Sequence, residues 1–288
     1  MWAFTGICHY AGICSAFTKK CGSCPVIGSK SNNDLSTRIF NKKKNLYKNA
    51  NITLVGCSRW IANCAKQSTL TLNGIKCTSI PNPIDTDIYK KQEKNIAREK
   101  LKLPLDKKII LFGSIKITDE RKGAQYMIDA CNVLAQQYPA EILKQITLVI
   151  FGKNTGQLKP LFPFNVHCLE YISNIEDIVA LYNSADVLVV PSLEDNLPNT
   201  IMEALACGTP CIGFNTGGIP EMIDHKENGY ISEYKSINDL AKGINWVLFE
   251  SDYEQLSLNS RQKVIDSYSE KIVAKQYINL YKILINKK

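Results

Sequence analysis

The stretch PSLEDNLPNTIMEALACGTPCIGFN, residues 191–215, combines acidic side chains with the start of a predicted helix. If Asn199 is the N-cap, the helix begins at Thr200, and its unpaired N–H groups and positive dipole end favour a phosphate. Glu203 lies about one turn further on, where a carboxylate can accept hydrogen bonds from hydroxyls such as a ribose diol. Asp195, in the preceding loop, is placed to meet a sugar beyond the phosphate. Alternatively, Glu203 only complements the helix dipole and LEDN is a solvated turn.

A parallel sheet is predicted to position this segment. Segments with a helical pattern separate most of the predicted strands, at 122–137, 174–184 and 199–207. Strands that alternate with helices, each strand a nearly continuous apolar run, predict a doubly wound α/β domain. Such sheets bind ligands outside the carboxyl ends of their strands, which is where residues 191–199 lie. The apolar runs that predict the strands are 108–114, 146–152, 166–172, 186–191, 210–214 and 229–232.

Residues 1–85 predict only part of a second domain. Two parallel strands and two helices bury too little apolar surface to stand alone, so we expect an incomplete, Rossmann-like N-terminal domain on the acceptor side. Residues 80–89, with two prolines, are the expected hinge before a donor-binding domain at 86–267. An amphipathic helix at 268–288 is expected to cross back to the N-terminal part. The predicted N-terminal elements are a Cys-rich loop to about residue 33, a basic helix at 34–49 with Leu35, Ile39 and Leu46 on one side, strands at 52–56 and 77–81, and a helix at 58–66.

The charge of the chain is unevenly distributed. Residues 1–85 hold eleven Lys or Arg against two Asp or Glu, whereas the other residues hold twenty-four against twenty-five. This excess predicts an anionic partner for the N-terminal part: a phospholipid surface, a pyrophosphate-linked lipid or nucleic acid. A solvated basic face is the alternative. No stretch reaches the roughly 18 uninterrupted apolar residues of a membrane span, so we expect a soluble or at most peripheral protein.

The eleven cysteines are odd in number and unevenly spaced, which favours reduced thiols in a cytosolic compartment. Four of them, Cys8, Cys14, Cys21 and Cys24, fall within seventeen residues and end in a C-x-x-C pair. Four such thiolates would form a structural zinc site without an open coordination position. Free thiols and disulfides are the alternatives.

The segment PSLEDNLPNTIMEALACGTPCIGFNTGGIPEMI resembles the donor-binding segment of the retaining glycosyltransferases of family 4, the glycosyl transferases group 1, which have the GT-B fold. That family shows two glutamates separated by seven residues, with a Gly-rich loop between them. Here Asp195 stands at the first position, for which Glu194 is an alternative, and Glu203 stands at the second. The resemblance implies that Glu203 binds the nucleotide ribose and that the helix start binds the diphosphate.

The segment LFGSIKITDERKGAQYMIDA, residues 111–130, resembles the first strand and helix of the same donor domain. Lys122 matches the family lysine that contacts the donor diphosphate. The usual arginine after the turn glycine Gly113 is replaced by Ser114, and Arg121 is the nearest cation that can supply its charge. Two cations at a helix entrance would neutralise a leaving diphosphate. Without the resemblance, DERKG is more typical of a solvated turn.

The segment LEYIS at 169–173 matches the part of the family that holds the base through backbone groups. The resemblance therefore implies catalytic roles for Arg121, Lys122, Asp195 and Glu203. It implies donor binding by Gly113, Ser114, Gly152, Tyr171, Ile172, Glu194, Asn196, Leu197, Pro198, Asn199 and Thr200.

The implied activity is that of a hexosyltransferase which moves a sugar from a nucleoside diphosphate sugar to an acceptor hydroxyl with retention. The resemblance implies no metal cofactor for catalysis, a saccharide or lipid-diphosphate-linked acceptor, and a role in surface polysaccharide biosynthesis at the inner membrane face. A chain lacking the front of its N-terminal domain is expected to bind donor without necessarily transferring it. The alternatives are a GT-B nucleotide-sugar epimerase and a basic zinc-containing nucleic-acid- or partner-binding protein. The second is disfavoured because too few strands are present in residues 1–85.

Overall fold

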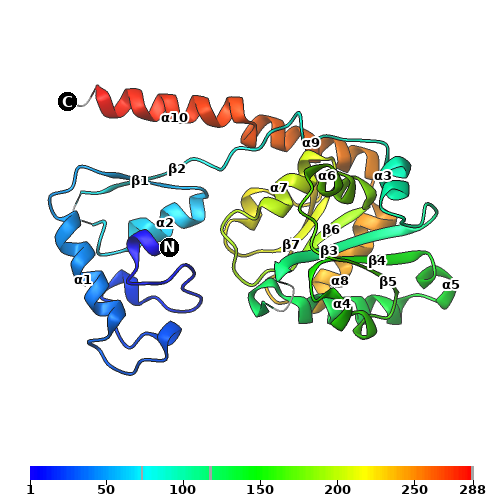
Figure 1. Ribbon diagram of the computed structural model, residues 1–288, viewed down its shortest axis with the longest axis horizontal. Helices are drawn as coiled ribbons and strands as arrows, with labels where there is room; N and C mark the ends of the chain where they lie inside the picture. Colours follow the sequence, from blue (N-terminus) through cyan, green and yellow to red (C-terminus); the bar gives the residue numbers. More distant parts are fainter. Residues whose placement is uncertain (73, 117–118, 287–288) are drawn as a thin grey trace. The chain divides into compact units, whose positions relative to one another are not determined.

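The computed structural model describes residues 1–72, 74–116 and 119–286 (Figure 1). The chain divides into two compact units, Met1–Pro81 and Asn82–Lys288. Within the described ranges, no helix combines the length and the apolar character that crossing a bilayer requires.

The second unit is built on a six-stranded, fully parallel sheet with the order β5-β4-β3-β6-β7-β8. The doubly wound sheet predicted from the apolar runs is therefore confirmed. The chain leaves β3 toward β4 and β5 on one side, then returns to β6 on the other. The helices that follow β3 and β6 consequently lie on opposite faces of the sheet (Figure 1), an arrangement that places a ligand crevice at the carboxyl ends of these two strands. The strands are β3 (Lys108–Lys116), β4 (Ile146–Lys153), β5 (Asn165–Leu169), β6 (Val187–Val190), β7 (Cys211–Phe214) and β8 (Gly229–Ser232).

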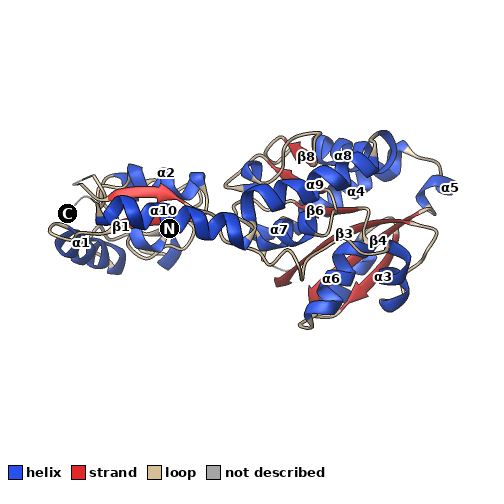
Figure 2. Ribbon diagram, turned by 90° about the horizontal axis from the view of Figure 1, so that it is seen from above, coloured by secondary structure: helices blue, strands red, loops and turns tan. Residues whose placement is uncertain are grey.

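Helices cover both faces of this sheet, as Figure 2 shows. On one face α4 packs against α8, and on the other α3 packs against α6 and α7 against α9. Because both faces are covered, side chains such as Ile110, Leu148 and Val189 are buried, which explains the continuous apolar runs. The helices are α3 (Lys94–Lys100), α4 (Ala124–Gln137), α5 (Ala140–Leu143), α6 (Ile175–Ser184), α7 (Asn199–Ala206), α8 (Ile237–Asn245), α9 (Tyr253–Tyr268) and α10 (Glu270–Ile285).

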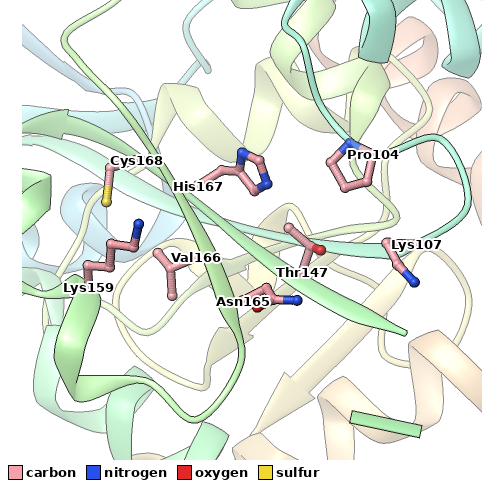
Figure 3. A pocket seen from close by; sticks show the side chains of 8 residues that line it. All are labelled: Pro104, Lys107, Thr147, Lys159, Asn165, Val166, His167 and Cys168. Atoms are coloured by element: carbon pink, nitrogen blue, oxygen red, sulfur yellow. The ribbon is translucent and has the colours of Figure 1, made fainter. Parts of the chain in front are cut away.

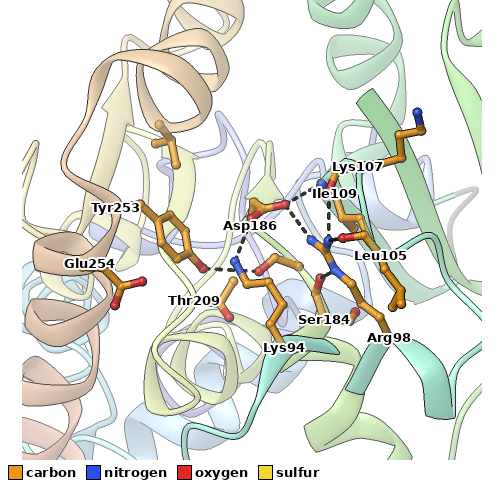
Figure 4. Close-up of polar contacts among 12 residues, drawn as sticks. Lys94, Arg98, Leu105, Lys107, Ile109, Ser184, Asp186, Thr209, Tyr253 and Glu254 are labelled. Carbon is orange, nitrogen blue, oxygen red and sulfur yellow. Dashed lines mark hydrogen bonds and ion pairs between the residues drawn. The ribbon is translucent and has the colours of Figure 1, made fainter. Parts of the chain in front are cut away.

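A buried ion-pair network fixes α3 to the amino ends of the central strands (Figure 4). One Asp186 carboxylate oxygen lies 2.9 Å from Arg98 Nη2 and accepts the Ile109 backbone N–H at 2.7 Å. Its other oxygen accepts from Lys94 Nζ at 2.7 Å. Arg98 also donates to the carbonyl of Ser184 and to two further backbone carbonyls. Four hydrogen bonds thus compensate the burial of the Arg98 guanidinium.

The first unit contains α1 (Leu35–Tyr47), α2 (Arg59–Gln67) and a parallel pair of strands, β1 (Thr53–Gly56) and β2 (Lys76–Ser79). Asp34 and Ser58 cap the two helices by accepting backbone N–H groups of the first turns. Lys43 of α1 is buried and donates to the carbonyls of Thr5 and Gly6 at 2.9 and 3.1 Å, which holds the N-terminal loop against the helix. Burial lowers the pKa of Lys43.

The side of α1 that carries Leu35, Ile39 and Leu46 is not the side that packs. The helix buries Ser36, Thr37, Phe40 and Lys43 instead. Leu35 and Leu46 keep 48% and 64% of their surface exposed. The last helix, α10, is similarly open, since Val273 is its one buried residue among those described. Its expected return to the N-terminal part stays a prediction, as do the functions assigned to the two units.

Candidate functional site

Two adjoining cavities lie at the carboxyl ends of the central strands of the second unit. The first, of about 310 Å³, is lined by Arg121 and Lys122 among others and is called the lysine cavity. The second, of about 240 Å³, is lined by Glu203 among others and is called the glutamate cavity. Ser114 and Thr200 line both, so the two cavities form one continuous site.

Close backbone packing places Lys122 beside the loop that follows β6. Gly123 has a φ of +72°, and a Cβ added there would lie 1.9 Å from the carbonyl oxygen of Pro191. Only glycine fits this approach. The Leu193 N–H also donates to the Arg121 carbonyl at 2.8 Å. The turn that looked like a solvated loop from composition is therefore fixed against residues 191–195.

Two carboxylates orient the two cations. Lys122 Nζ lies 2.6 Å from Asp195 Oδ2, and Arg121 Nη1 lies 3.5 Å from the same oxygen. Arg121 also donates to the Glu194 carbonyl at 2.8 Å and approaches Asp119 at 3.4 Å. The charges of Arg121 and Lys122 are thus balanced by Asp119 and Asp195. The amino end of α7 contributes a further partial positive charge. A phosphate entering the lysine cavity would meet donors that are already directed by these contacts.

The structure places Asp195 directly behind the two cations. Its side chain is buried, faces Lys122 and Arg121, and does not line either cavity. A second close packing fixes the backbone of this loop: Gly217, with a φ of +59°, would bring a Cβ to 1.9 Å from the Asp195 carbonyl oxygen, which also accepts the Gly218 N–H. The loop is thus held inward. Among the predicted donor-binding residues, Glu194, Asn196, Leu197 and Pro198 likewise do not line the two cavities.

Helix α7 starts one residue earlier than predicted. Asn199 is its first residue, and Pro198, in an extended conformation, holds the N-cap position in its place. The Pro198 carbonyl accepts the N–H groups of Ile201 and Met202 at 3.1 and 3.3 Å. The amides of Asn199 and Thr200 precede this turn and have no intrahelical acceptor. Both residues line the glutamate cavity, and Thr200 also lines the lysine cavity.

Glu203 is half-buried and accepts a hydrogen bond from the Tyr182 hydroxyl at Oε2, 2.7 Å away. Burial raises the pKa of Glu203 above its ordinary value of 4.5, and the bond from Tyr182 acts in the opposite direction. Burial also raises the pKa of Tyr182, so its hydroxyl stays protonated and holds one carboxylate oxygen. The other oxygen is available to a hydroxyl ligand in the glutamate cavity.

Sequence reasoning missed Tyr182 and the apolar wall of the glutamate cavity. A tyrosine inside an apolar helical pattern was the available signal, because a buried hydroxyl needs a partner. The wall consists of Phe151, Ile178 and Leu181. The predicted residues that do line one or both cavities are Gly113, Ser114, Arg121, Lys122, Gly152, Tyr171, Ile172, Asn199, Thr200 and Glu203.

A separate cavity of about 470 Å³ lies on the edge strand β5 and shares no lining residue with the other two (Figure 3). Lys107, Lys159 and the exposed His167 line it. Lys107 pairs with Asp106 at 3.2 Å. The cavity lies toward the amino ends of β4 and β5, remote from the crevice.

The zinc site proposed for the N-terminal cysteines is not supported. Among the described residues, no group of three or more His, Cys, Asp or Glu side chains is arranged to hold a metal ion. All eleven cysteines, each within the described ranges, are free thiols. Burial and the neighbouring Cys24 and Cys21 raise the pKa of Cys8 to about 11, so its thiol stays protonated. Cys21 Sγ instead accepts the Gly6 N–H at 3.2 Å. Cys8, Cys21 and Cys24 pack as small buried residues, and Cys14 is partly exposed.

The part of the chain that holds both cavities matches a known family. Residues 93–265, more than half of the 288, match the family described as Glycosyl transferases group 1. The chain belongs to this family.

Relatives and solved structures agree with this membership. An uncharacterized glycosyltransferase of Methanocaldococcus jannaschii, MJ1607, is 30% identical over 208 residues, which are 70% of this chain and 52% of the relative. The sucrose-phosphate synthase (tll1590) from Thermosynechococcus elongatus has a TM-score of 0.69 at 24% identity, covering 87% of this chain and 62% of that one. Anabaena Alr3699/HepE, solved in complex with UDP-glucose, has a TM-score of 0.67 at 19% identity, covering 85% of this chain and 67% of that one.

The fold of this chain matches that of GT-B glycosyltransferases, which confirms the expected fold class. The chain spans about half the length of the relatives it matches.

Proposed function

We propose that this group 1 family member binds a nucleoside diphosphate sugar and provides the donor site for retaining transfer of the sugar to an acceptor hydroxyl. One observation carries the proposal: Lys122, Arg121 and the first turn of α7 line a cavity that adjoins the cavity of Glu203. A cation pair beside helix amides suits a diphosphate, and a half-buried carboxylate suits a ribose diol. The binding of UDP-glucose by HepE, which has the same fold, supports this donor class.

The geometry favours one orientation of the donor. The diphosphate lies in the lysine cavity, the ribose hydroxyls donate to Glu203, and the base lies between Tyr171, Ile172 and the apolar wall. Negative charge develops on the diphosphate as the glycosidic bond breaks, and Lys122 and Arg121 are placed to stabilise it. Asp195 acts as a positioning residue, because its buried carboxylate holds both cations.

A panel of UDP, GDP and ADP sugars tests the proposal. A nucleotide sugar that binds the folded protein will raise its unfolding temperature in proportion to the logarithm of its concentration above Kd. We expect one base to give the largest shift, and Glu203→Ala to reduce it strongly. If none of the donors stabilises the protein, or if Glu203→Ala leaves the shift intact, the donor site is wrong. Product analysis separates the alternative activities. Transfer or hydrolysis separates the sugar from the nucleoside diphosphate, whereas epimerisation changes the configuration of the sugar.

The pH dependence of donor binding gives a second test. We expect affinity to rise with pH as Glu203 ionises, because the carboxylate accepts hydroxyl hydrogen bonds and the protonated acid accepts fewer. Because burial raises the pKa of Glu203, affinity is lost on acidification at a higher pH than an exposed glutamate would give. Calorimetric Kd values for the nucleotide sugar, measured between about pH 4 and 8, check this. Glu203→Gln should bind weakly at every pH, and a surviving pH step in that variant would contradict the assignment.

The acceptor is proposed from the charge of the first unit. Residues 1–81 carry eleven Lys or Arg and a single acid, Asp34. We propose a saccharide acceptor linked to a lipid diphosphate, used in surface polysaccharide assembly on the cytoplasmic side of a membrane. Nucleic acid is not the proposed partner.

A further inference from the structure

The side of α1 turned away from the N-terminal unit combines apolar and basic side chains in the described structure. Leu35 and Leu46 are 48% and 64% exposed, and Ile39, one turn after Leu35, is partly exposed. Arg38 and Lys42 are exposed and lie four residues apart, one turn along the helix. They form a basic stripe beside the apolar one. We refer to Leu35, Arg38, Ile39, Lys42 and Leu46 as the α1 outer face.

An exposed tryptophan contacts a lysine of the same helix. Lys43 Nζ lies 4.0 Å from the ring centroid of Trp2, which is 55% exposed. Lys43 is four residues after Ile39 and three before Leu46, so it is a neighbour of both on the helix surface. The contact with Lys43 thus attaches the exposed Trp2 ring to α1. Tryptophan is enriched at membrane interfaces, where its ring meets the acyl boundary and its N–H meets water.

We infer that the α1 outer face docks on the surface of an anionic lipid bilayer. Helices that lie in the membrane interface bury an apolar stripe at the acyl boundary and direct basic residues to anionic headgroups. The first unit has both the apolar stripe and the basic residues, Arg38 and Lys42, beside it. Its one acid, Asp34, is buried as the cap of α1 and so does not repel an anionic surface. A polynucleotide would use the same charge but would gain nothing from exposed leucines, so the apolar stripe favours lipid.

This inference deepens the proposed function by naming the surface that would bring the chain to a lipid-linked acceptor. Vesicle binding and nucleotide binding are measured separately on the same protein. Loss of one without the other therefore identifies which proposal fails.

The experiment is sedimentation of the full chain with vesicles of phosphatidylcholine alone or with phosphatidylglycerol added, at fixed ionic strength. We expect binding to the anionic vesicles only, with a blue shift of tryptophan emission that Trp2→Tyr removes. Arg38→Glu/Lys42→Glu should reduce partitioning by at least about tenfold, since each basic residue near the surface contributes on the order of a fivefold factor. Leu46→Ser should reduce it several-fold.

Matched controls distinguish this face from a diffuse charge effect. Lys66→Glu/Lys76→Glu changes the net charge of the same unit equally, at exposed positions on α2 and β2. Leu258→Ser removes a leucine of α9 that is 59% exposed. Both controls should bind vesicles nearly as well as the unaltered chain.

Four results would overturn the inference. Equal loss in the two charge-reversal pairs would show that net charge alone is sensed. Absence of binding to anionic vesicles would remove the partner. Tighter binding of the outer face to a polynucleotide at the same salt concentration would assign the face to nucleic acid. An oligomer in light scattering that Leu46→Ser dissociates would assign it to a second copy of the chain. Unfolding temperatures measured for every variant show that each still folds.

Discussion

Lys122→Met is expected to weaken the binding of a nucleoside diphosphate about ten- to hundredfold while leaving the affinity for the bare nucleoside unchanged. A hydrogen bond to a charged group contributes about 1.5–3 kcal/mol, and each 1.4 kcal/mol corresponds to a factor of ten. The loss should therefore appear only when the phosphates are present. Where the donor sugar is turned over, the rate should fall further, by about 10²–10³, because negative charge grows on the leaving diphosphate. Calorimetry with nucleoside, nucleoside monophosphate and nucleoside diphosphate measures the difference.

The substitution also leaves the buried Asp195 carboxylate without its nearest cation, so a conformational effect must be separated from a direct one. Lys122 Nζ lies 2.6 Å from Asp195 Oδ2, and the nearest alternative cation, Arg121, lies 3.5 Å away. Lys122→Met/Asp195→Asn removes both charges together and should recover the stability lost in the single variant. If the double variant also recovers diphosphate affinity, Lys122 acts through the loop and does not contact the phosphate.

Lys159→Met is the control for removal of one positive charge from the same unit. Lys159 lines the remote cavity at β5 (Figure 3), so diphosphate affinity should be unchanged. If Lys159→Met and Lys122→Met reduce affinity equally, long-range charge explains the effect, and the lysine cavity is not the phosphate site.

Asp186→Asn is expected to lower the free energy of unfolding by about 3–5 kcal/mol, the cost of leaving a buried charge without its partner. The Arg98 side chain is only 4% exposed and lies 2.9 Å from the Asp186 carboxylate (Figure 4). Asparagine keeps the shape and its amide oxygen can still accept the Ile109 N–H, but its NH2 group cannot accept from Lys94, so the loss includes the charge and this one acceptor. Urea-induced unfolding, followed by circular dichroism, measures it.

Asp224→Asn provides the matched comparison for that loss. Asp224 pairs with Lys263 at 2.8 Å, but its side chain is 49% exposed, so removal of the pair should cost less than about 1 kcal/mol. Asp186 lies at the amino end of β6, and nucleotide affinity of Asp186→Asn should be normal in the folded protein. If Asp186→Asn loses no more stability than Asp224→Asn, the charge of Arg98 is compensated by groups other than Asp186.

Tertiary contacts redirected several residues that the sequence had placed by spacing. Asp195 stands eight residues before Glu203, and the cations at 121 and 122 hold its buried carboxylate, while Gly217 packs closely against its backbone carbonyl. Leu35, Ile39 and Leu46 share a side of α1, but the loop that covers the helix lies on the side of Phe40 and Lys43. In each case the contacting residues lie in a distant part of the chain. The local periodicity of the sequence carries no information about such contacts.

The amino-acid sequence by itself determined the α/β class and the place of the crevice. A strand covered on both faces must be apolar along its whole length, so each strand of the parallel sheet is visible locally, and the loop after β6 is followed at once by a helix start. The family resemblance already implied that Lys122 and the helix start at Thr200 meet, and both line one cavity. Only the tertiary structure decided that Tyr182 holds Glu203 and that Asp186 neutralises Arg98. These pairs are far apart in the chain, and their energies depend on burial, which exists only after the strands and helices have packed.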